Sequence, residues 1–440
     1  MQGRRIAIII AICFLTAGCL QAQQMVTLEN AVAAALSHNY DILLAENDSA
    51  AAAIDKQYIY SGFLPAVNAV VGRTRTVSAQ KQRYKDRPEV EGSGIKTTNL
   101  NAAINLNWVL FDGLKMFATR EKTNELFELG RLNLKNQVIN SVADVISAYY
   151  IIVRQKQQLK AIEEQMSINE ERVKLADRKL SVGLGTKPEL LQAKVDLNAQ
   201  KAAHLEQQSI MSQSKEALNQ LTGMQLPGDF EVADSIPINA GIQLPDIQEN
   251  IETTSPSILQ AIKNVDISKI ALKEVKGTRW PTISFGSAYN FTRNDIANNI
   301  SPFAPIFSRN KGFNFGFTAN IPLLNYMSVN RNIKQAKLDI AYQETAMEKQ
   351  KNTVNVMVKA GYYNYRFQVS ALQLEQENIE LAKENVAIAL ERFKLGVSTY
   401  LELREAQKSL EDAYDRLIAA RYNTKLAETE LLRLKGELVR

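Results

Sequence analysis

The side chains that most often carry metal or thiol chemistry are scarce in this chain. Of its 440 residues, two are Cys and two are His. Cys13 and Cys19 lie within the first 20 residues, and His38 and His204 are far apart. These counts exclude a Cys-rich zinc site, a disulfide framework and most Cys/His catalysis. No enzyme activity, cofactor or metal is expected, although a site made only of carboxylates stays open.

Glu402 and Glu405 are the carboxylates whose spacing is most suggestive. They lie six and nine residues after Gly396, and a spacing of three puts both on one face of a helix. Glu189 has the matching position six residues after Gly183. A plainer interpretation, solvated carboxylates on a charged helix surface, stays open.

Long helices must carry these carboxylates. No Pro interrupts Lys115 to Ser181, which as one helix would be ~100 Å long and would make the molecule elongated. Apolar side chains recur every seven residues, and this period indicates helices packed lengthwise in a left-handed supercoil. His204 lies on such a seam, where we expect a packed or hydrogen-bonded side chain, and His38 is expected at a helix end. The seams are Val138, Val145, Ile152, Leu159, Met166, Val173 and Leu180; Leu190, Leu197, His204, Met211 and Leu218; Val358, Tyr365, Leu372, Ile379, Val386 and Phe393; and Leu403, Leu410, Leu417, Thr424 and Leu431.

Two similar turns join these helices into hairpins. Gly183 and Gly396 supply the left-handed conformation that ends a helix, and Thr186 and Thr399 can cap the next one. Pro188 falls in the first turn of the new helix, where it is tolerated. Both turns should lie at one end of the bundle.

The chain is a tandem repeat. Gly183 and Gly396 are 213 positions apart, as are Tyr149-Tyr150 and Tyr362-Tyr363. Upstream the offset becomes 216. We therefore predict a first repeat over 23–223, a linker over 224–250 and a second repeat over 251–440.

Residues 1–22 have the features of an export signal. Arg4 and Arg5 precede the apolar run Ile6–Leu15, which is too short to span a bilayer. Cleavage after Ala22 is favoured; cleavage before Cys19 would instead produce a lipoprotein.

Four segments alternate between apolar and polar residues and predict strands. They cover 66–73, 99–110, 282–292 and 313–321, with Asn, Gly and Thr opposite the apolar face. Strands of ~10 residues can cross a bilayer when tilted. The loops between them, 78–96 and 294–311, are expected to be long and polar.

An exported chain with such strands fits a transmembrane barrel better than a soluble sheet. Four strands cannot close around a lumen, and open edges are not tolerated in lipid. Three copies give twelve strands, whereas two would give eight, a barrel that side chains fill. The sequence thus favours a trimer in which Trp108 and Trp280 lie at the membrane interface.

Several segments resemble the TolC-type outer-membrane efflux family (outer membrane factors). They are Thr27–Ala31, Gly62–Pro65, Trp108–Gly113, Arg178–Thr186 and Phe393–Gly396. The resemblance covers nearly the whole mature chain and rests on the duplicated motif order. It implies an α+β membrane protein whose long antiparallel hairpins form an α-barrel. Four transmembrane strands per chain would complete a trimeric twelve-strand β-barrel in the outer membrane of a Gram-negative bacterium, above a long periplasmic portion.

The resemblance also implies partners and site residues. The trimer would be the passive exit duct of a tripartite pump, docked to a periplasmic adaptor and an inner-membrane transporter. Glu402, Glu405, Glu189 and the retained aromatic Phe393 would form the periplasmic gate, but Ser398 stands where the family's gate has an Arg. Threefold symmetry would make Glu402 and Glu405 two rings of negative charge, which favour cations. The adaptor would contact the turns at Val182, Gly183, Leu184, Leu395, Gly396 and Val397.

Other functions stay open. The chain could be the outlet of a type I protein secretion system, or a periplasmic adaptor or structural coiled-coil protein, although an adaptor should lack the four strands. Lys and Arg number 52 and Asp and Glu 47, a net charge of +5. That excess is too small to indicate nucleic-acid binding.

Overall fold

The computed structural model describes residues 24–299, 305–324 and 326–438. Its contacts divide the chain into two compact units. Unit 1 contains the chain before Ala50, Arg131–Gln260 and the chain after Met347; unit 2 contains Ala50–Gly130 and Ala261–Met347. Each unit takes segments from both predicted repeats, so the repeat boundaries stay a prediction. The export signal at 1–22 and Cys19 lie outside the described residues.

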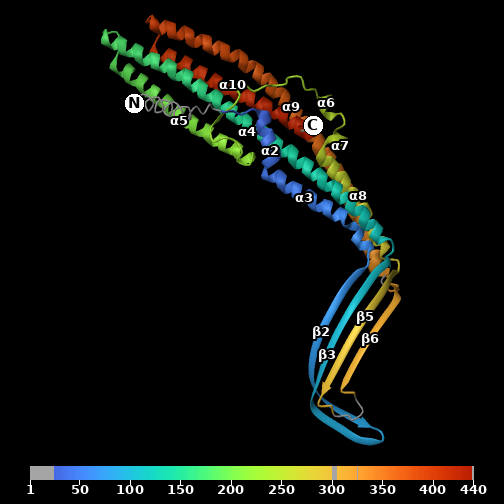
Figure 1. Cartoon of the computed structure of the whole chain (residues 1–440). Helices are drawn as coiled ribbons and strands as arrows, with labels where there is room; N and C mark the ends of the chain where they lie inside the picture. Colours follow the sequence, from blue (N-terminus) through green and yellow to red (C-terminus); the bar gives the residue numbers. More distant parts are fainter. Residues whose placement is uncertain (1–23, 300–304, 325, 439–440) are drawn as a thin grey trace, which may run out of the picture. The chain divides into compact units, whose positions relative to one another are not determined.

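Long helices dominate the fold (Figure 1). They are α4 (Lys115–Ser181), α5 (Lys187–Leu221), α9 (Tyr326–Lys394) and α10 (Tyr400–Lys435). Helix α4 has 67 residues with the predicted bounds. In unit 1 the α4–α5 and α9–α10 turns lie at the same end, as expected.

The seven-residue seams form much of the core of unit 1. Val145, Ile152 and Leu218 are fully buried in a cluster that also contains Phe230 and Tyr422. A second cluster packs α9 against α10. The predicted seam positions that are buried are Val145, Ile152, Leu190, Leu218, Val358, Tyr365, Leu372, Ile379, Val386, Phe393, Leu403, Leu410, Leu417, Thr424 and Leu431.

Toward the turn, the buried face of α4 departs from the predicted seam. Met166, Val173 and Leu180 are only half-buried. Gln165, Asn169, Arg172 and Ala176 are buried instead. A straight α-helix repeats every 3.6 residues, so a strict seven-residue series drifts around its surface. The drift brings polar side chains into the helix packing.

Shorter elements pack beside the long helices. They are α2 (Leu28–His38), α3 (Tyr40–Gln57), η1 (Ile59–Phe63), α6 (Leu244–Gln248), α7 (Ile251–Thr254) and α8 (Pro256–Gly277). His38 ends α2, as predicted. His204 is also confirmed as an interhelix residue, because its Nε2 lies 3.2 Å from Glu163 Oε1 on α4.

The segment predicted as a linker is partly structured. Strand β4 (Phe230–Glu231) pairs in parallel with β1 (Gln24–Met25). Lys156 Nζ on α4 donates to the carbonyl of Val232 at 2.9 Å. These contacts hold residues 230–232 against the helices of unit 1.

Unit 2 contains one antiparallel sheet of four strands in the order β2-β3-β5-β6. The strands are β2 (Ala66–Tyr84), β3 (Arg87–Phe111), β5 (Thr282–Ala297) and β6 (Phe307–Asn320). The register aligns Trp108, Phe285 and Phe317 on one face. Asn68, Asn105, Ala288 and Asn314 are aligned on the other. The predicted apolar and Asn-rich faces are both present.

The predicted strand lengths and one predicted loop are wrong. The strands have 19, 25, 16 and 14 residues rather than about ten. Residues 78–96 form the far end of the β2–β3 hairpin, which has a tight turn because Tyr84 pairs with Arg87. Backbone hydrogen bonds continue the hairpin after the apolar alternation has ended, so alternation alone does not predict this part.

Candidate functional site

The two helix turns of unit 1 expose apolar side chains. Val182, Leu184, Leu395 and Val397 are each at least 63 % exposed. Gly183 and Gly396 have φ angles of 78° and 75°, in the left-handed region that favours glycine. Exposed apolar turns are typical of protein interfaces. All six residues predicted to dock an adaptor thus lie at the end of unit 1 that carries both turns.

Caps fix the helices that follow these turns. Thr186 Oγ1 accepts from Glu189 N, and Thr186 N donates to Glu189 Oε2 at 3.3 Å, which completes a capping box. Thr399 caps α10 by accepting from Glu402 N at 3.2 Å. The carboxylates of Glu189 and Glu402 therefore also stabilise helix N-termini, where the helix dipole favours negative charge.

Glu402 and Glu405 are exposed on the first turns of α10. Together with Arg392 and Ser398 they line an open cavity of about 390 Å³ between α9 and α10. Their shared helix face is as predicted. Within the described part of the chain, no group of three or more His, Cys, Asp or Glu side chains could hold a metal ion.

Phe393 links the two hairpins close to the turns. Its ring is 6 % exposed and lies 3.9 Å from Lys179 Nζ. Lys179 also donates to the Phe393 carbonyl at 2.8 Å. A Lys on α4 thus binds both the ring and the backbone of α9.

Further from the turns, Arg172 joins the hairpins in an arrangement that sequence reasoning missed. Its guanidinium is 3 % exposed and donates to Asp196 Oδ2 on α5 at 2.8 Å. It also donates to Asn169, to Gln407 on α10 and to the Tyr400 hydroxyl. Tyr400 Oη in turn donates to Asp196 Oδ2 at 2.7 Å. We call Asn169, Arg172, Asp196, Tyr400 and Gln407 the Arg172 cluster.

The protonation states of this cluster follow from its contacts. Burial raises the pKa of Asp196, but hydrogen bonds from Tyr400, Arg172 and Gln192 outweigh it and leave the pKa below its usual value. Burial and the hydrogen bond to Asp196 raise the pKa of Tyr400 to about 12. At neutral pH the carboxylate is therefore charged and the phenol is a donor.

Helical repeat geometry was the signal that could have revealed the cluster. The apolar series selected Val173, whereas the buried residue is its neighbour Arg172. Gln165, Asn169, Arg172 and Ala176 follow a spacing of four, three and four, which is a helix face. A search for this spacing among polar as well as apolar residues would have identified these four positions.

The two Trp residues lie in unit 2, beside the helix-side ends of its strands. Trp108 Nε1 donates to the Phe63 carbonyl at 2.8 Å, and its side chain is partly exposed. Trp280 lies just before β5 and is 62 % exposed. An apolar ring with a polar N–H suits a membrane–water boundary. The interface assignment stays a prediction.

The sequence model described as "Outer membrane efflux protein" matches residues 31–224 and 248–437. This chain belongs to that outer membrane efflux protein family. The match covers most of the chain, so membership does not depend on any single motif. As a member of the family it is an outer-membrane protein with the fold of an efflux channel and a long periplasmic helical portion.

The individual proteins that the chain resembles are also outer-membrane proteins. The chain is 21 % identical over 413 residues to the probable efflux pump outer membrane protein TtgC of Pseudomonas putida, covering 93 % of this chain and 82 % of TtgC. It is 22 % identical to outer membrane protein TolC of Vibrio cholerae, covering 90 % and 86 %. The CmeC outer membrane channel of Campylobacter jejuni has the same fold, with a TM-score of 0.75 at 17 % identity over 93 % and 85 % of the chains. None of the helices described here has an apolar stretch long enough to cross a membrane.

Proposed function

We propose that this efflux family member is a homotrimeric channel that serves as the passive exit duct of a tripartite efflux pump. A periplasmic adaptor and an inner-membrane transporter would be its partners. The four-stranded sheet carries this proposal, because one face is apolar, the other is lined with Asn, and both edges lack a partner strand within the described ranges. The relatives called efflux pump proteins favour small molecules as the exported class.

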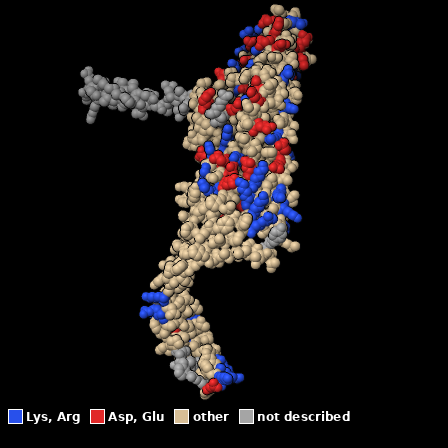
Figure 2. All heavy atoms as spheres, turned by 90° about the vertical axis from the view of Figure 1, so that its right-hand side faces the viewer, with Lys and Arg blue, Asp and Glu red and all other residues tan. Residues whose placement is uncertain are grey.

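The sheet supports assembly around a lumen. Phe313, Phe315 and Phe317 of edge strand β6 are 66–71 % exposed. On the face seen in Figure 2, the strand region is largely free of charged side chains. Neither β2 nor β6 pairs with a further strand among the described residues. Three copies would satisfy the open edges, with aromatic side chains toward lipid and Asn toward water.

Helix α9 carries a second apolar seam that its own chain leaves uncovered. Phe367, Leu374, Leu381 and Ile388 recur every seven residues and are more than half exposed. The covered seam at Leu372, Ile379 and Val386 already packs against α10. A second seam of this period fits a helix of a neighbouring copy, since knobs-into-holes packing needs a partner with the same repeat.

The turns and the Arg172 cluster support the docking and gating roles. We assign the exposed turns to adaptor docking and the carboxylates of Glu402, Glu405 and Glu189 to the gate. Ser398 cannot supply the family's gate cation, but Lys179 and Arg172 already join the two hairpins within one copy. We infer that these contacts hold the duct closed. Phe393 takes part because Lys179 contacts both its ring and its carbonyl.

The oligomeric state tests the central proposal. Chemical crosslinking and mass measurement of the detergent-purified full-length chain should give three copies. The double variant Leu374→Glu, Leu381→Glu should yield monomers, because it places charges on the uncovered seam. The control Gln376→Glu adds charge at an exposed α9 position on another face of the helix, two residues after Leu374 and five before Leu381, and should remain trimeric. A wild-type monomer or dimer would overturn the proposal.

A transport measurement tests the pump assignment. Deleting the gene should raise intracellular accumulation of small apolar compounds, and the wild-type gene should restore efflux. Unchanged accumulation together with loss of a secreted protein would replace the pump assignment with a secretion outlet.

A further inference from the structure

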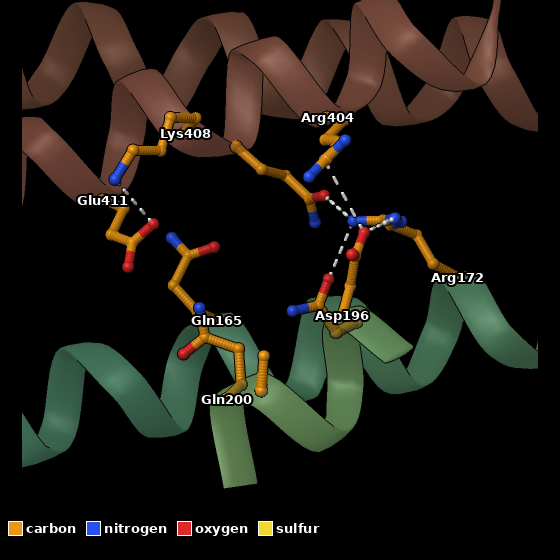
Figure 3. Close-up of a pocket in the computed structure, with 10 residues that line it drawn as sticks. Gln165, Arg172, Asp196, Gln200, Arg404, Lys408 and Glu411 are labelled. Carbon is orange, nitrogen blue, oxygen red and sulfur yellow. Dashed lines mark hydrogen bonds and ion pairs between the residues drawn. The ribbon is translucent and has the colours of Figure 1, made fainter. Parts of the chain in front are cut away.

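A polar cavity of about 170 Å³ lies between α4, α5 and α10 in unit 1, next to the Arg172 cluster. Figure 3 shows its labelled side chains converging from α4 and α5 on one side and from α10 on the other. A water molecule takes up about 30 Å³ in the liquid, so the cavity is several times larger than one water. Asn169, Arg172, Asp196 and Gln407 of the Arg172 cluster line it, whereas the turn residues and the gate carboxylates do not.

The buried lining atoms that lack a partner are all hydrogen-bond donors. They are Gln165 Nε2, Arg172 Nε and Gln407 Nε2, on side chains that are each at least 94 % buried. The amide orientation of Gln407 follows from its neighbour, because its Oε1 already accepts from Arg172. A buried donor without an acceptor costs free energy. A group that accepts several hydrogen bonds would satisfy these three donors together.

The charges around the cavity favour an anion. Asp196 accepts from Arg172 and Tyr400 through Oδ2 and from Gln192 through Oδ1, so its oxygens are already used. Arg404 reaches Asp196 only at 3.8 Å, whereas Lys408 pairs with Glu411 at 3.3 Å and with Asp412, outside the lining, at 3.0 Å. The lining contains three cationic and two anionic side chains. Arg404, whose contact with a carboxylate is the longest of the three, would attract a negatively charged ligand.

We propose that this cavity binds a small oxyanion, such as phosphate or a carboxylate, between the two hairpins of one copy. Gln165 Nε2, Gln407 Nε2 and Arg172 Nε would donate to its oxygens, and Arg404 would balance its charge. A carboxylate only accepts, and phosphate accepts through its unprotonated oxygens, so either suits the three unpartnered donors better than water, which must also donate.

Such a ligand would couple to hairpin position. Gln165 and Arg172 belong to the first hairpin, and Gln407 and Arg404 to the second. A ligand that contacts both binds only while the hairpins are packed together, so it stabilises that arrangement. The coupling rests on the proposed gate, but the binding itself does not.

Calorimetric titration tests the binding. The detergent-purified full-length protein is titrated with inorganic phosphate, and separately with acetate, in a buffer without other oxyanions. We expect saturable binding of at least one of them at one site per chain. Gln165→Leu should weaken it about tenfold or more, since one hydrogen bond to a charged group is removed. Gln407→Glu keeps an acceptor for Arg172 but adds negative charge, and it should abolish binding.

A control variant and a test of folding accompany the titration. Gln208→Leu removes an exposed amide of α5 away from the cavity and should bind like wild type. Thermal unfolding of each variant without ligand establishes that it is folded. If neither anion binds, or if Gln407→Glu binds as well as wild type, the proposal is wrong and the cavity holds only water. The conductance of the channel in planar bilayers, measured without added oxyanion, tests the proposed duct independently of anion binding.

Discussion

Single side chains decide how tightly the two hairpins are held. Arg172 is the least exposed charged residue in the described part of the chain. Its burial is tolerated because four hydrogen bonds satisfy its N–H donors, and the Asp196 carboxylate also neutralises its charge. The acceptors are Asn169, Gln407, Asp196 and Tyr400. Breaking a buried pair is costly because the remaining charge has no partner.

Replacing Arg172 should therefore destabilise unit 1 strongly. Arg172→Met keeps much of the side-chain volume but removes the guanidinium that pairs with Asp196 at 2.8 Å, and we expect a loss of about 3–5 kcal/mol in unfolding free energy. Urea unfolding followed by circular dichroism measures this loss. Arg366→Met, at an exposed site on α9, should change stability by less than about 0.5 kcal/mol. Equal effects in the two variants would contradict the role given to the Arg172 cluster.

The same cluster predicts a pH dependence. The pKa of Asp196 is lower in the folded protein than the ordinary value of 3.8. Its stabilisation is complete above that ordinary value and is lost as pH falls through the folded pKa. Asp196→Asn should thus have a lower melting temperature than wild type at pH 6, and the difference should shrink as pH falls below 4. A difference that stays constant from pH 6 to pH 2 would exclude ionisation of Asp196 as its cause.

At the scale of elements, the sequence determined helices better than strands. The bounds of α4 follow from an uninterrupted run without Pro and from Gly183, whose left-handed conformation ends the hairpin's first helix. The hairpin of β2 and β3 extends to Tyr84 and Arg87 through residues that are polar on both faces. Cross-strand hydrogen bonds hold that extension, and they leave no periodic signal in the side chains.

Two leucines in the first turn of α10, two positions apart, provide a test of the helix packing. Leu403 is fully buried, whereas Leu401 is 67 % exposed. Leu403→Ala should cost about 2–5 kcal/mol, because it leaves a cavity in the seam. Leu401→Ala should cost less than about 0.5 kcal/mol in the isolated copy. Both changes are made in the Leu374→Glu, Leu381→Glu variant, which is expected to be monomeric, and thermal and urea unfolding compare them. Similar losses would mean that α10 packs in another register.

At the scale of the whole molecule, alternating strands and seven-residue seams predicted the architecture but not the buried polar site. The alternation leads to the sheet of unit 2, and the seams lead to the hairpins of unit 1. Arg172, Asp196 and Tyr400 belong to different helices, and Tyr400 and Asp196 are 204 positions apart. Their association depends on how the hairpins pack in three dimensions. A search for apolar periodicity passes over such residues.

The assembled channel should be selective for cations through Glu402 and Glu405. Both carboxylates are exposed on one face of α10, and in a trimer each would be present three times around the axis. Rings of negative charge raise the local concentration of cations and repel anions. Glu402→Gln, Glu405→Gln should therefore shift the reversal potential under a KCl gradient in planar bilayers toward zero.

Gln preserves side-chain size, and the change at position 402 would still leave the Thr399 hydroxyl free to cap α10. Glu206→Gln, an exposed site on α5, serves as the control and should leave selectivity unchanged. If the double variant keeps the wild-type reversal potential, these carboxylates are surface groups and the selective ring lies elsewhere.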